Sequence, residues 1–206
     1  MNIHKITVIG HGNVGGTLAK RWADAGHTVT IGARDPKEVE DNSLAKNNGI
    51  TIADIPSSVE TADIILVAIP SQATAELAQS LPNLNGKIII DATNAVMKGP
   101  DPYETGYHAF EDLTKATVVK SFNSTGFENM KDPVYGDHHL DMFMAGDDEN
   151  AKEVVRQLAL DIGFENCYDF GGGEKVVLLE KFALSWINLA IMQGVGRNIG
   201  FKVLHR

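Results

Sequence analysis

Three glycines near the start of the chain have the spacing of a dinucleotide-binding turn. Gly10, Gly12 and Gly15 form a GxGxxG pattern that directly follows the apolar run at 5–9 and opens a helical pattern. In such a turn the first glycine permits a tight bend, the second lets backbone N–H groups approach a pyrophosphate, and the third lets helix and strand pack closely. The positive end of the helix dipole adds attraction for phosphate. The spacing therefore predicts a dinucleotide site.

The residues after the second apolar run, at 28–31, indicate which dinucleotide binds. An NAD-specific site usually has an Asp or Glu there to accept from the ribose 2′-hydroxyl, but this chain has a glycine and an alanine. Arg34 and Lys37 follow, and a guanidinium with a nearby ammonium suits a 2′-phosphate. Asp35 has two interpretations, an N-cap of the next helix or a ribose ligand. We expect NADP(H) to be preferred.

Small and amide residues follow the later strands of the predicted sheet. Ligands of open α/β sheets lie at the carboxyl ends of the strands, so the segments 68–71, 92–95 and 121–124 are expected to line the nicotinamide half of the site. The predicted cofactor contacts there are Ala68, Ile69, Pro70, Asn94 and Ala95. Asn123 is predicted to contact the hydride acceptor, while Asn94 has a turn cap as its alternative interpretation.

No residue has the pattern of a general acid, which carbonyl reduction generally needs beside the hydride acceptor. His108, His138 and His139 lie in irregular stretches and are more typical of a surface. Lys120 ends a strand and is either catalytic or a contact to a loop carbonyl or the cofactor. No HExxH or CxxC spacing indicates a metal, so no catalytic residue and no metal ligand are assigned. A flavin or deazaflavin acceptor, whose ring supplies its own electronics, suits such a site.

Apolar runs that alternate with helical patterns must position these residues. The predicted strands are 5–9, 28–31, 50–52, 63–68, 87–91 and 117–120, and the predicted helices between them include 14–25, 72–81 and one that Asp35 caps. This alternation is typical of an α/β fold of Rossmann type, doubly wound on a mainly parallel sheet. The stretch 121–141 has no period and is interpreted as a site loop.

The end of the chain is expected to be helical. A strand at 140–145, a helix at 148–162 and a short strand at 165–170 precede three glycines that act as a hinge. Beyond them a helical tail from about 174 to 200 is apolar on more than one side. We therefore divide the chain into an NADP-binding Rossmann domain, 1–170, and a C-terminal helical segment, 171–206, which packs on that domain or on a dimer partner.

Composition excludes several classes of partner. With 18 basic and 27 acidic residues the net charge is −9, which would repel nucleic acid. The longest apolar stretch, 176–192, is interrupted by charged and polar residues, which argues against a membrane span. The chain has a single cysteine, Cys167, and no basic-then-apolar leader precedes the first strand. We expect a cytoplasmic protein whose partner is a small-molecule hydride acceptor.

Motifs along nearly the whole chain resemble one known family. They are IGHGNVGGTLA, GARDPK, LVAIP, DATNA, VVKSFNSTGFENM and GRNIGFKVL, and they are similar to those of the NADP oxidoreductase family that includes the F-420-dependent NADP reductases. The cytosolic reductase domains of six-transmembrane metalloreductases are also similar. The resemblance implies an NADPH site at His11, Gly12, Asn13 and Val14, a 2′-phosphate site at Arg34 with Lys37, and an acceptor cleft near Asn94, Met97 and Phe122. It also implies a homodimer built partly on the C-terminal helices.

Three functions follow from these patterns. The first is hydride transfer between NADP(H) and a flavin or a deazaflavin such as coenzyme F-420. The second is an NADP-dependent dehydrogenase or imine reductase of a small metabolite, which would use the 121–141 loop. The third is a non-catalytic NADP(H)-binding sensor whose assembly changes when the dinucleotide binds.

Overall fold

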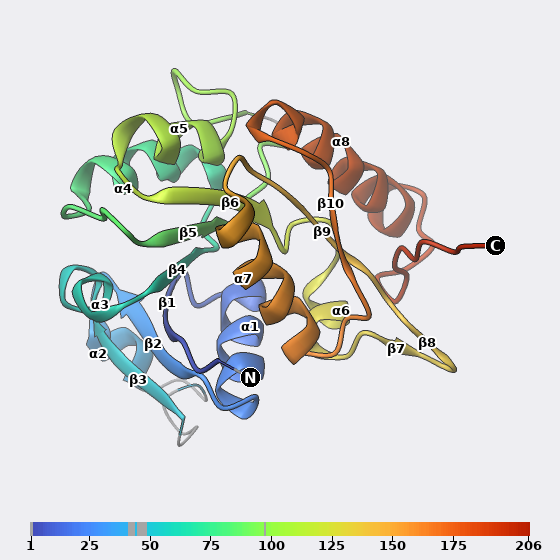
Figure 1. Ribbon diagram of the computed structural model, residues 1–206, viewed down its shortest axis with the longest axis horizontal. Helices are drawn as coiled ribbons and strands as arrows, with labels where there is room; N and C mark the ends of the chain where they lie inside the picture. The colour runs from blue at the N-terminus through green and yellow to red at the C-terminus, as the bar shows by residue number, and fades with distance from the viewer. Residues whose placement is uncertain (1, 41–43, 45–48, 97) are drawn as a thin grey trace.

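An eight-stranded sheet forms the centre of the protein (Figure 1). The computed structural model describes residues 2–40, 44, 49–96 and 98–206. The strands of this sheet, in chain order, are β1 (Lys5–Ile9), β2 (Thr28–Ala33), β3 (Ile50–Asp54), β4 (Ile64–Val67), β5 (Ile88–Asp91), β6 (Thr117–Ser121), β9 (Met142–Ala145) and β10 (Cys167–Asp169). Their order across the sheet is β10-β9-β6-β5-β4-β1-β2-β3.

The sheet is mainly parallel. Strands β1 to β6 run in one direction, and β9 pairs with β6 in the antiparallel sense and with β10 in the parallel sense. The chain leaves β1 toward β2 and β3 and later returns to the other side of β1 through β4. Dinucleotides bind where such an order reverses, at the carboxyl ends of the strands. The predicted Rossmann-type doubly wound fold is confirmed, and it places the site beside β1 and β4.

Helices cover both faces of the sheet. They are α1 (Asn13–Asp24), α2 (Pro36–Glu40), α3 (Ile55–Thr61), α4 (Thr74–Ser80), α5 (Gly106–Leu113), α6 (Phe127–Lys131), α7 (Glu149–Asp161) and α8 (Val176–Ile187). On one face α1 contributes Trp22 and α7 contributes Leu158 to an apolar core. On the other face α3, α4, α5 and α8 enclose a second core, to which α8 contributes Leu179. The C-terminal helix therefore packs against the sheet of its own chain.

Short polar side chains begin α2, α3, α5 and α7, but the helix at the glycine turn has no such cap. Asp54 caps α3 through the Ser57 N–H at 2.9 Å, and Asp148 caps α7 through the Ala151 N–H at 2.8 Å. These side chains satisfy backbone donors that a helix leaves unpaired. Helix α1 begins after Gly12, which has no side chain to offer. Its first N–H groups are left for another acceptor.

The structure corrects three element predictions. The stretch 121–141 is not a bare loop, because it contains α6 and a hairpin of β7 (Val134–Tyr135) and β8 (His138–His139). The short helices α3 and α5 were not predicted as elements. The C-terminal helix does not reach 200, because α8 ends in a π-helical turn at Asn188–Met192. Beyond it the chain turns at Gly194 and Gly196, both with positive φ, and ends in a tail without helix or strand.

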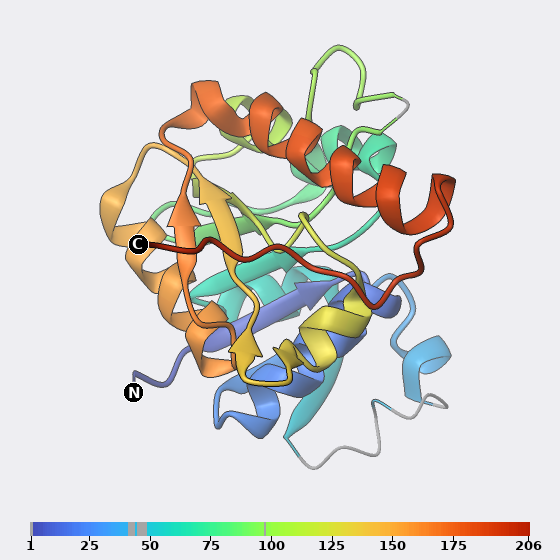
Figure 2. The same ribbon diagram turned by 90° about the vertical axis from the view of Figure 1, so that its right-hand side faces the viewer.

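That tail crosses back over the body of the protein (Figure 2). The Phe201 carbonyl accepts from the Asp141 N–H at 3.1 Å, and the Val203 N–H donates to the Asp141 carboxylate at 2.7 Å. Trp186 of α8 donates from its indole to the Ile199 carbonyl at 2.7 Å. These bonds join the last residues to the sheet edge and to α8. Over the described residues, no helix has both the length and the apolar character that crossing a membrane requires.

Candidate functional site

The glycine turn between β1 and α1 is shaped by backbone contacts. Gly10 has φ +98°, and a Cβ there would lie 2.3 Å from the Ala68 carbonyl oxygen after β4. A Cβ on Gly15 would lie 1.8 Å from the Gly10 carbonyl oxygen, so no other residue fits without moving the backbone. A Cβ on Gly12 would meet no atom within 4 Å. The first and third glycines thus close the turn, while the second leaves open space above it.

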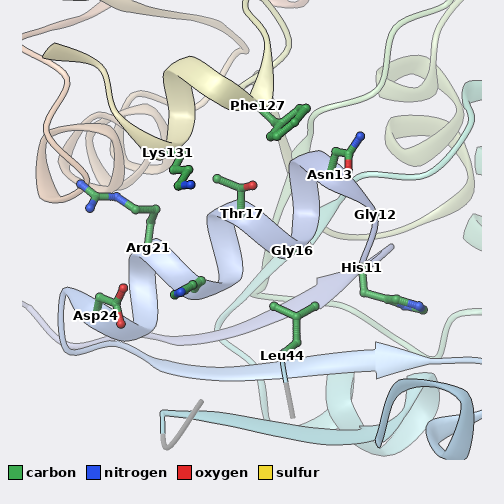
Figure 3. Close-up of a pocket in the computed structure, with 11 residues that line it drawn as sticks. His11, Gly12, Asn13, Gly16, Thr17, Arg21, Asp24, Leu44, Phe127 and Lys131 are labelled. Carbon is green, nitrogen blue, oxygen red and sulfur yellow. The ribbon is translucent and has the colours of Figure 1, made fainter. Parts of the chain in front are cut away.

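A groove of ≈600 Å³ starts at this turn and follows α1 (Figure 3). Three of the predicted cofactor residues, His11, Gly12 and Asn13, line its beginning. Its further lining includes residues that the sequence did not indicate, namely Gly16, Thr17, Lys20, Arg21, Asp24, Leu44, Phe127 and Lys131. The last two lie on α6, which faces α1 across the groove. The groove therefore joins the helix N-terminus to a mostly basic surface.

The end of β2 presents the two predicted phosphate ligands to solvent. Arg34 and Lys37 are exposed, and their cationic groups form no ion pair with any residue that the structure describes. The Asp35 carboxylate accepts from the Lys37 N–H at 3.0 Å, as expected of an N-cap at the start of α2. Two exposed cations, with no ion pair to the part of the chain that the structure describes, therefore stand one strand away from the glycine turn.

The segment after β4 lies directly beside the turn. The Ala68 N–H donates to the Ile9 carbonyl at 2.9 Å, which holds the chain after β4 against the end of β1. Ala68 and Ile69 are half-buried, and Pro70 is exposed. Val14, on the first turn of α1, is also half-buried. The structure thus brings 68–70 and the glycine turn to one edge of the sheet.

Two asparagines join the ends of β5 and β6. Asn94 donates from its amide to the Asn123 carbonyl at 2.9 Å, and Asn123 donates from its amide to Asn94 Oδ1 at 3.0 Å. Asn123 is buried, and its Oδ1 has no partner among the described residues. Both polar ends of the Asn94 amide are thus bonded to Asn123. Asn94 links two strand ends that the sequence placed in one predicted site.

Beneath this pair lies a buried ionic cluster. Lys120 is 0% exposed, and its ammonium donates to Asp91 Oδ2 at 2.9 Å, to the Thr93 carbonyl at 2.6 Å and to Glu180 Oε1 at 2.5 Å. The other Glu180 oxygen accepts from the Ala95 N–H at 2.9 Å. All three donors of the ammonium are used. Of the two interpretations of Lys120, the structure supports contact to a loop carbonyl.

Phe122 has a different environment from the one predicted. It has φ +55°, which is an outlier for a bulky residue, and its ring is fully buried at 5.4 Å from the ring of Trp22, edge to face. Its side chain offers no surface to an acceptor, because it fills the core beneath α1. The ring therefore does not line the acceptor cleft that was predicted near Phe122. Met97, the other apolar residue of the predicted acceptor cleft, lies outside the described residues.

Two of the histidines considered as titratable candidates form hydrogen bonds within the protein. His108 Nδ1 lies 2.8 Å from the Thr105 hydroxyl at the start of α5. His138 and His139 are exposed on β8, and His139 Nδ1 contacts the Gly163 carbonyl at 2.8 Å. Over the described residues, no group of three or more His, Cys, Asp or Glu is arranged to hold a metal ion. The Cys167 thiol is buried, and burial raises its pKa to about 12.

The fold and the glycine turn define a class, a Rossmann-type α/β domain. In a comparison with known proteins, the model of the family described as NADP oxidoreductase, coenzyme F420-dependent, matches residues 5–95 of this chain. The predicted resemblance is confirmed, and with it the prediction of an NADP-dependent oxidoreductase.

Similar proteins extend this match beyond the first half of the chain. An F420-dependent NADP reductase from Methanothermobacter thermautotrophicus is 28% identical over 98% of this chain and 95% of its own length. A crystal structure from Arthrobacter sp. FB24, of a protein assigned as an F420-dependent NADP reductase, has a TM-score of 0.80 at 28% identity and covers 98% of this chain and 100% of that one. The rat metalloreductase STEAP3 is 28% identical over 78% of this chain but only 32% of its own length.

Sequence reasoning missed the second carboxylate of the ionic cluster. Asp91 and Lys120 stand at the ends of apolar strands, and Glu180 is an acidic residue within an apolar helix. The helical pattern indicated only that this stretch was too polar for a membrane. A charged residue inside an otherwise apolar helix is the signal that such a partner exists, because burying it requires a counter-charge.

Proposed function

We propose that this protein transfers hydride between NADP(H) and coenzyme F420 or a related flavin. The observation that carries the proposal is the glycine turn, where α1 begins without a capping side chain and Gly12 borders open space. The kinship with F420-dependent NADP reductases supports the choice of both substrates.

The glycine turn fits a pyrophosphate. The open space above Gly12 is where a Cβ would stand in any other residue, and among the described residues no side chain caps the first N–H groups of α1. Those donors and the helix dipole favour a negatively charged group. Gly12 and Asn13 would hold the pyrophosphate through their backbone, and His11 would border it.

The end of β2 fits the 2′-phosphate that distinguishes NADP from NAD. Arg34 and Lys37 are exposed and form no ion pair with the residues that the structure describes, so both cations are open to a phosphate on that side. Asp35 is bonded to the helix backbone, which favours the capping interpretation over a ribose ligand. The guanidinium would bind the phosphate through two N–H groups, and the ammonium would add charge.

The charged side chains that the structure describes in the nicotinamide half of the site are paired with one another. Lys120 uses all three of its N–H groups within the cluster, and Asp91 and Glu180 are its partners. Asn94 and Asn123 bond to each other. When bound, NADPH supplies the hydride and the deazaflavin or flavin ring supplies the electron-accepting system. The protein's part is to orient the two rings and to exclude water.

A homodimer is part of this proposal. Large apolar side chains are exposed along α8 and the turn that follows it: Leu178 at 52%, Leu189 at 42%, Ile191 at 54%, Met192 at 63% and Val195 at 59%. A row of this kind is typical of a surface that a partner covers. We infer that a second copy of the chain covers it. Sedimentation of wild type and of Ile191→Glu tests this, because the variant should sediment as a monomer.

The setting we propose is the cytoplasm. The chain has one cysteine, which is buried and forms no disulfide, in keeping with a reducing compartment. The acceptor is then a soluble cofactor that diffuses to the site.

Oxidation of NADPH followed at 340 nm, with coenzyme F420, FMN, FAD and riboflavin offered in turn, tests the reaction. We expect turnover with F420 or one flavin, and a slower rate when NADH replaces NADPH. Turnover only with imines or small carbonyl compounds would favour a dehydrogenase or imine reductase instead. Binding of NADPH that alters assembly, without turnover of any acceptor, would favour a sensor.

A further inference from the structure

The ionic cluster fixes a backbone segment that the proposed function places at the nicotinamide. Residues 93 and 95 flank Asn94 on the loop after β5. Lys120 holds the Thr93 carbonyl at 2.6 Å, and Glu180 holds the Ala95 N–H at 2.9 Å. The loop is therefore held from both sides of Asn94. The Asn94 side chain is then held against Asn123, which follows the neighbouring strand.

Glu180 is the residue that connects these contacts to the rest of the protein. One of its carboxylate oxygens accepts from Lys120 and the other from the Ala95 N–H, so a single group spans β6, the loop and α8. Its side chain is only 10% exposed, and the ammonium that it faces is 0% exposed. Hydrogen bonds of this kind in a water-poor setting are geometrically demanding and hold their partners in one position.

We propose that Glu180 is a positioning residue for the nicotinamide half of the cofactor site. Resting on the proposed function, this inference gives the C-terminal helix a direct part in that site, beyond its packing on the sheet. Its carboxylate, oriented by Lys120, holds the loop after β5 so that the Asn94–Ala95 backbone meets the nicotinamide in one geometry. The pyrophosphate and 2′-phosphate contacts lie on other strands and do not depend on it.

Glu180→Gln removes one of the two contacts of the carboxylate. The glutamine oxygen keeps the bond to the Lys120 ammonium, which is the stronger donor because it is charged. The amide nitrogen then faces the Ala95 N–H, where two donors meet and no bond forms. We expect faster hydrogen exchange at the Ala95 amide in the ligand-free protein, because that amide loses its acceptor.

Ligand affinity shows whether the loop positions the nicotinamide. NADPH contains the nicotinamide half. In contrast, 2′,5′-ADP contains only the adenosine half, with its 2′-phosphate and 5′-phosphate. We expect Glu180→Gln to weaken NADPH binding about three- to tenfold, the effect of about one hydrogen bond, and to leave the dissociation constant of 2′,5′-ADP unchanged. kcat with F420 or a flavin should fall as well, because the hydride donor loses its orientation.

Asp169→Asn is a matched control at another buried lysine. The Asp169 carboxylate also spans a lysine and a backbone N–H, Lys152 Nζ at 2.6 Å and Gly171 N at 2.8 Å, but it lies at the end of β10. Because β10 runs against the six parallel strands, its end lies away from the predicted site. This variant should change neither Ala95 exchange nor either dissociation constant.

A second variant covers the event that Glu180→Gln fails to fold. Glu180→Asp keeps the negative charge opposite Lys120 but is one methylene shorter, so it should reach the ammonium and lose Ala95. Unchanged Ala95 exchange in the folded variant, or equal weakening of NADPH and 2′,5′-ADP, would overturn the inference. Hydrogen exchange at Ala95 is measured without a cofactor, so it tests the inference about Glu180 independently of binding. Failure of the wild-type protein to bind NADPH would overturn the proposed function instead.

Discussion

The two ends of the predicted cofactor site differ in what builds them. At the β1–α1 turn the walls are backbone: Gly10 and Gly15 touch carbonyl oxygens where a Cβ would otherwise stand. At the ends of β5 and β6 the walls are side chains, Lys120 and Glu180 with the Asn94–Asn123 pair. The first end leaves its donors free for a ligand, whereas the second has already paired nearly all of its polar groups. We infer that the first end supplies affinity and the second supplies orientation.

The largest effect should come from the side-chain end. Lys120→Met leaves the Asp91 carboxylate, 0% exposed, and the Glu180 carboxylate, 10% exposed, without their cation. Breaking a buried pair in this way costs about 3–5 kcal/mol of unfolding free energy. Urea denaturation measures it, with Lys152→Met as the comparison.

That comparison is informative because the carboxylates that Lys152 pairs with are less buried. Asp169 is 29% exposed and Glu149 is 82% exposed, so water can solvate both after the substitution. Lys152→Met should therefore cost clearly less. Equal losses for the two variants would mean that the cluster at β5 and β6 is no more tightly built than an ordinary surface pair.

The glycine turn should separate stability from binding. Gly12→Ala adds a Cβ that meets no protein atom within 4 Å, so the variant should fold normally. That Cβ stands where a phosphate would approach, and losing one hydrogen bond to a charged group, about 1.5–3 kcal/mol, weakens NADPH at least tenfold. Calorimetric titration measures the binding, and thermal unfolding measures the stability.

Gly15→Ala is the same substitution three residues later, with a different expected result. Its Cβ would lie 1.8 Å from the Gly10 carbonyl oxygen, so the backbone of the turn must move. This variant should lose stability as well as NADPH binding. If Gly12→Ala bound NADPH as tightly as wild type, the pyrophosphate would not lie over this turn.

These two ends also differ in how well the sequence predicted them. The glycine turn is encoded within six residues. Each glycine is required by local sterics, and the strand pattern before the turn and the helix pattern after it identify the turn in the sequence. The cluster depends on Lys120 and Glu180, which are 60 residues apart in the chain, and only the fold brings α8 over β6. No spacing rule applies across that separation. The burial of Phe122 under Trp22 was likewise not visible from its place after a strand.

The strand order was predictable for a similar local reason. Continuous apolar runs such as that of β4 are typical of central parallel strands, and β4 is fully buried. The two short helices α3 and α5 were missed because each has eight residues or fewer, too short for a clear helical period. The last residues of α8 were apolar enough to extend the pattern, but the glycines at 194 and 196 have positive φ and end the helical path.

A smaller effect should separate the two phosphate-binding parts of the site. Arg34→Glu removes the guanidinium proposed for the 2′-phosphate and adds a repelling charge, so the preference for NADPH over NADH should fall about ten- to hundredfold. NADH affinity should change little, because the pyrophosphate is held at the glycine turn. The two dissociation constants, measured for wild type and variant, check this. An unchanged ratio would contradict the 2′-phosphate assignment.

The smallest effect should arise at the amino-terminal ends of the parallel strands, where no cofactor is expected. His27, just before β2, has a fully buried side chain, and this burial lowers its pKa below the ordinary 6.5. The nearby Asp161 carboxylate raises the pKa, while the neighbouring His4 lowers it further. Because the folded-state pKa is the lower one, the unfolded chain takes up the proton first. Stability from this group is therefore fully present above pH 6.5, begins to fall below that value, and is lost once the pH has passed the lower folded-state pKa.

Urea denaturation between pH 7.5 and pH 5 measures this loss, and His27→Gln should flatten the part of the slope that begins near pH 6.5. NADPH affinity over the same range should be alike in both proteins, since His27 is at the amino ends of the strands and the glycine turn is at their carboxyl ends. If the NADPH affinities of wild type and His27→Gln differed as the pH changed, the two ends of the parallel strands would be energetically coupled. The molecule could then not be divided into a cofactor-binding end and a purely structural end.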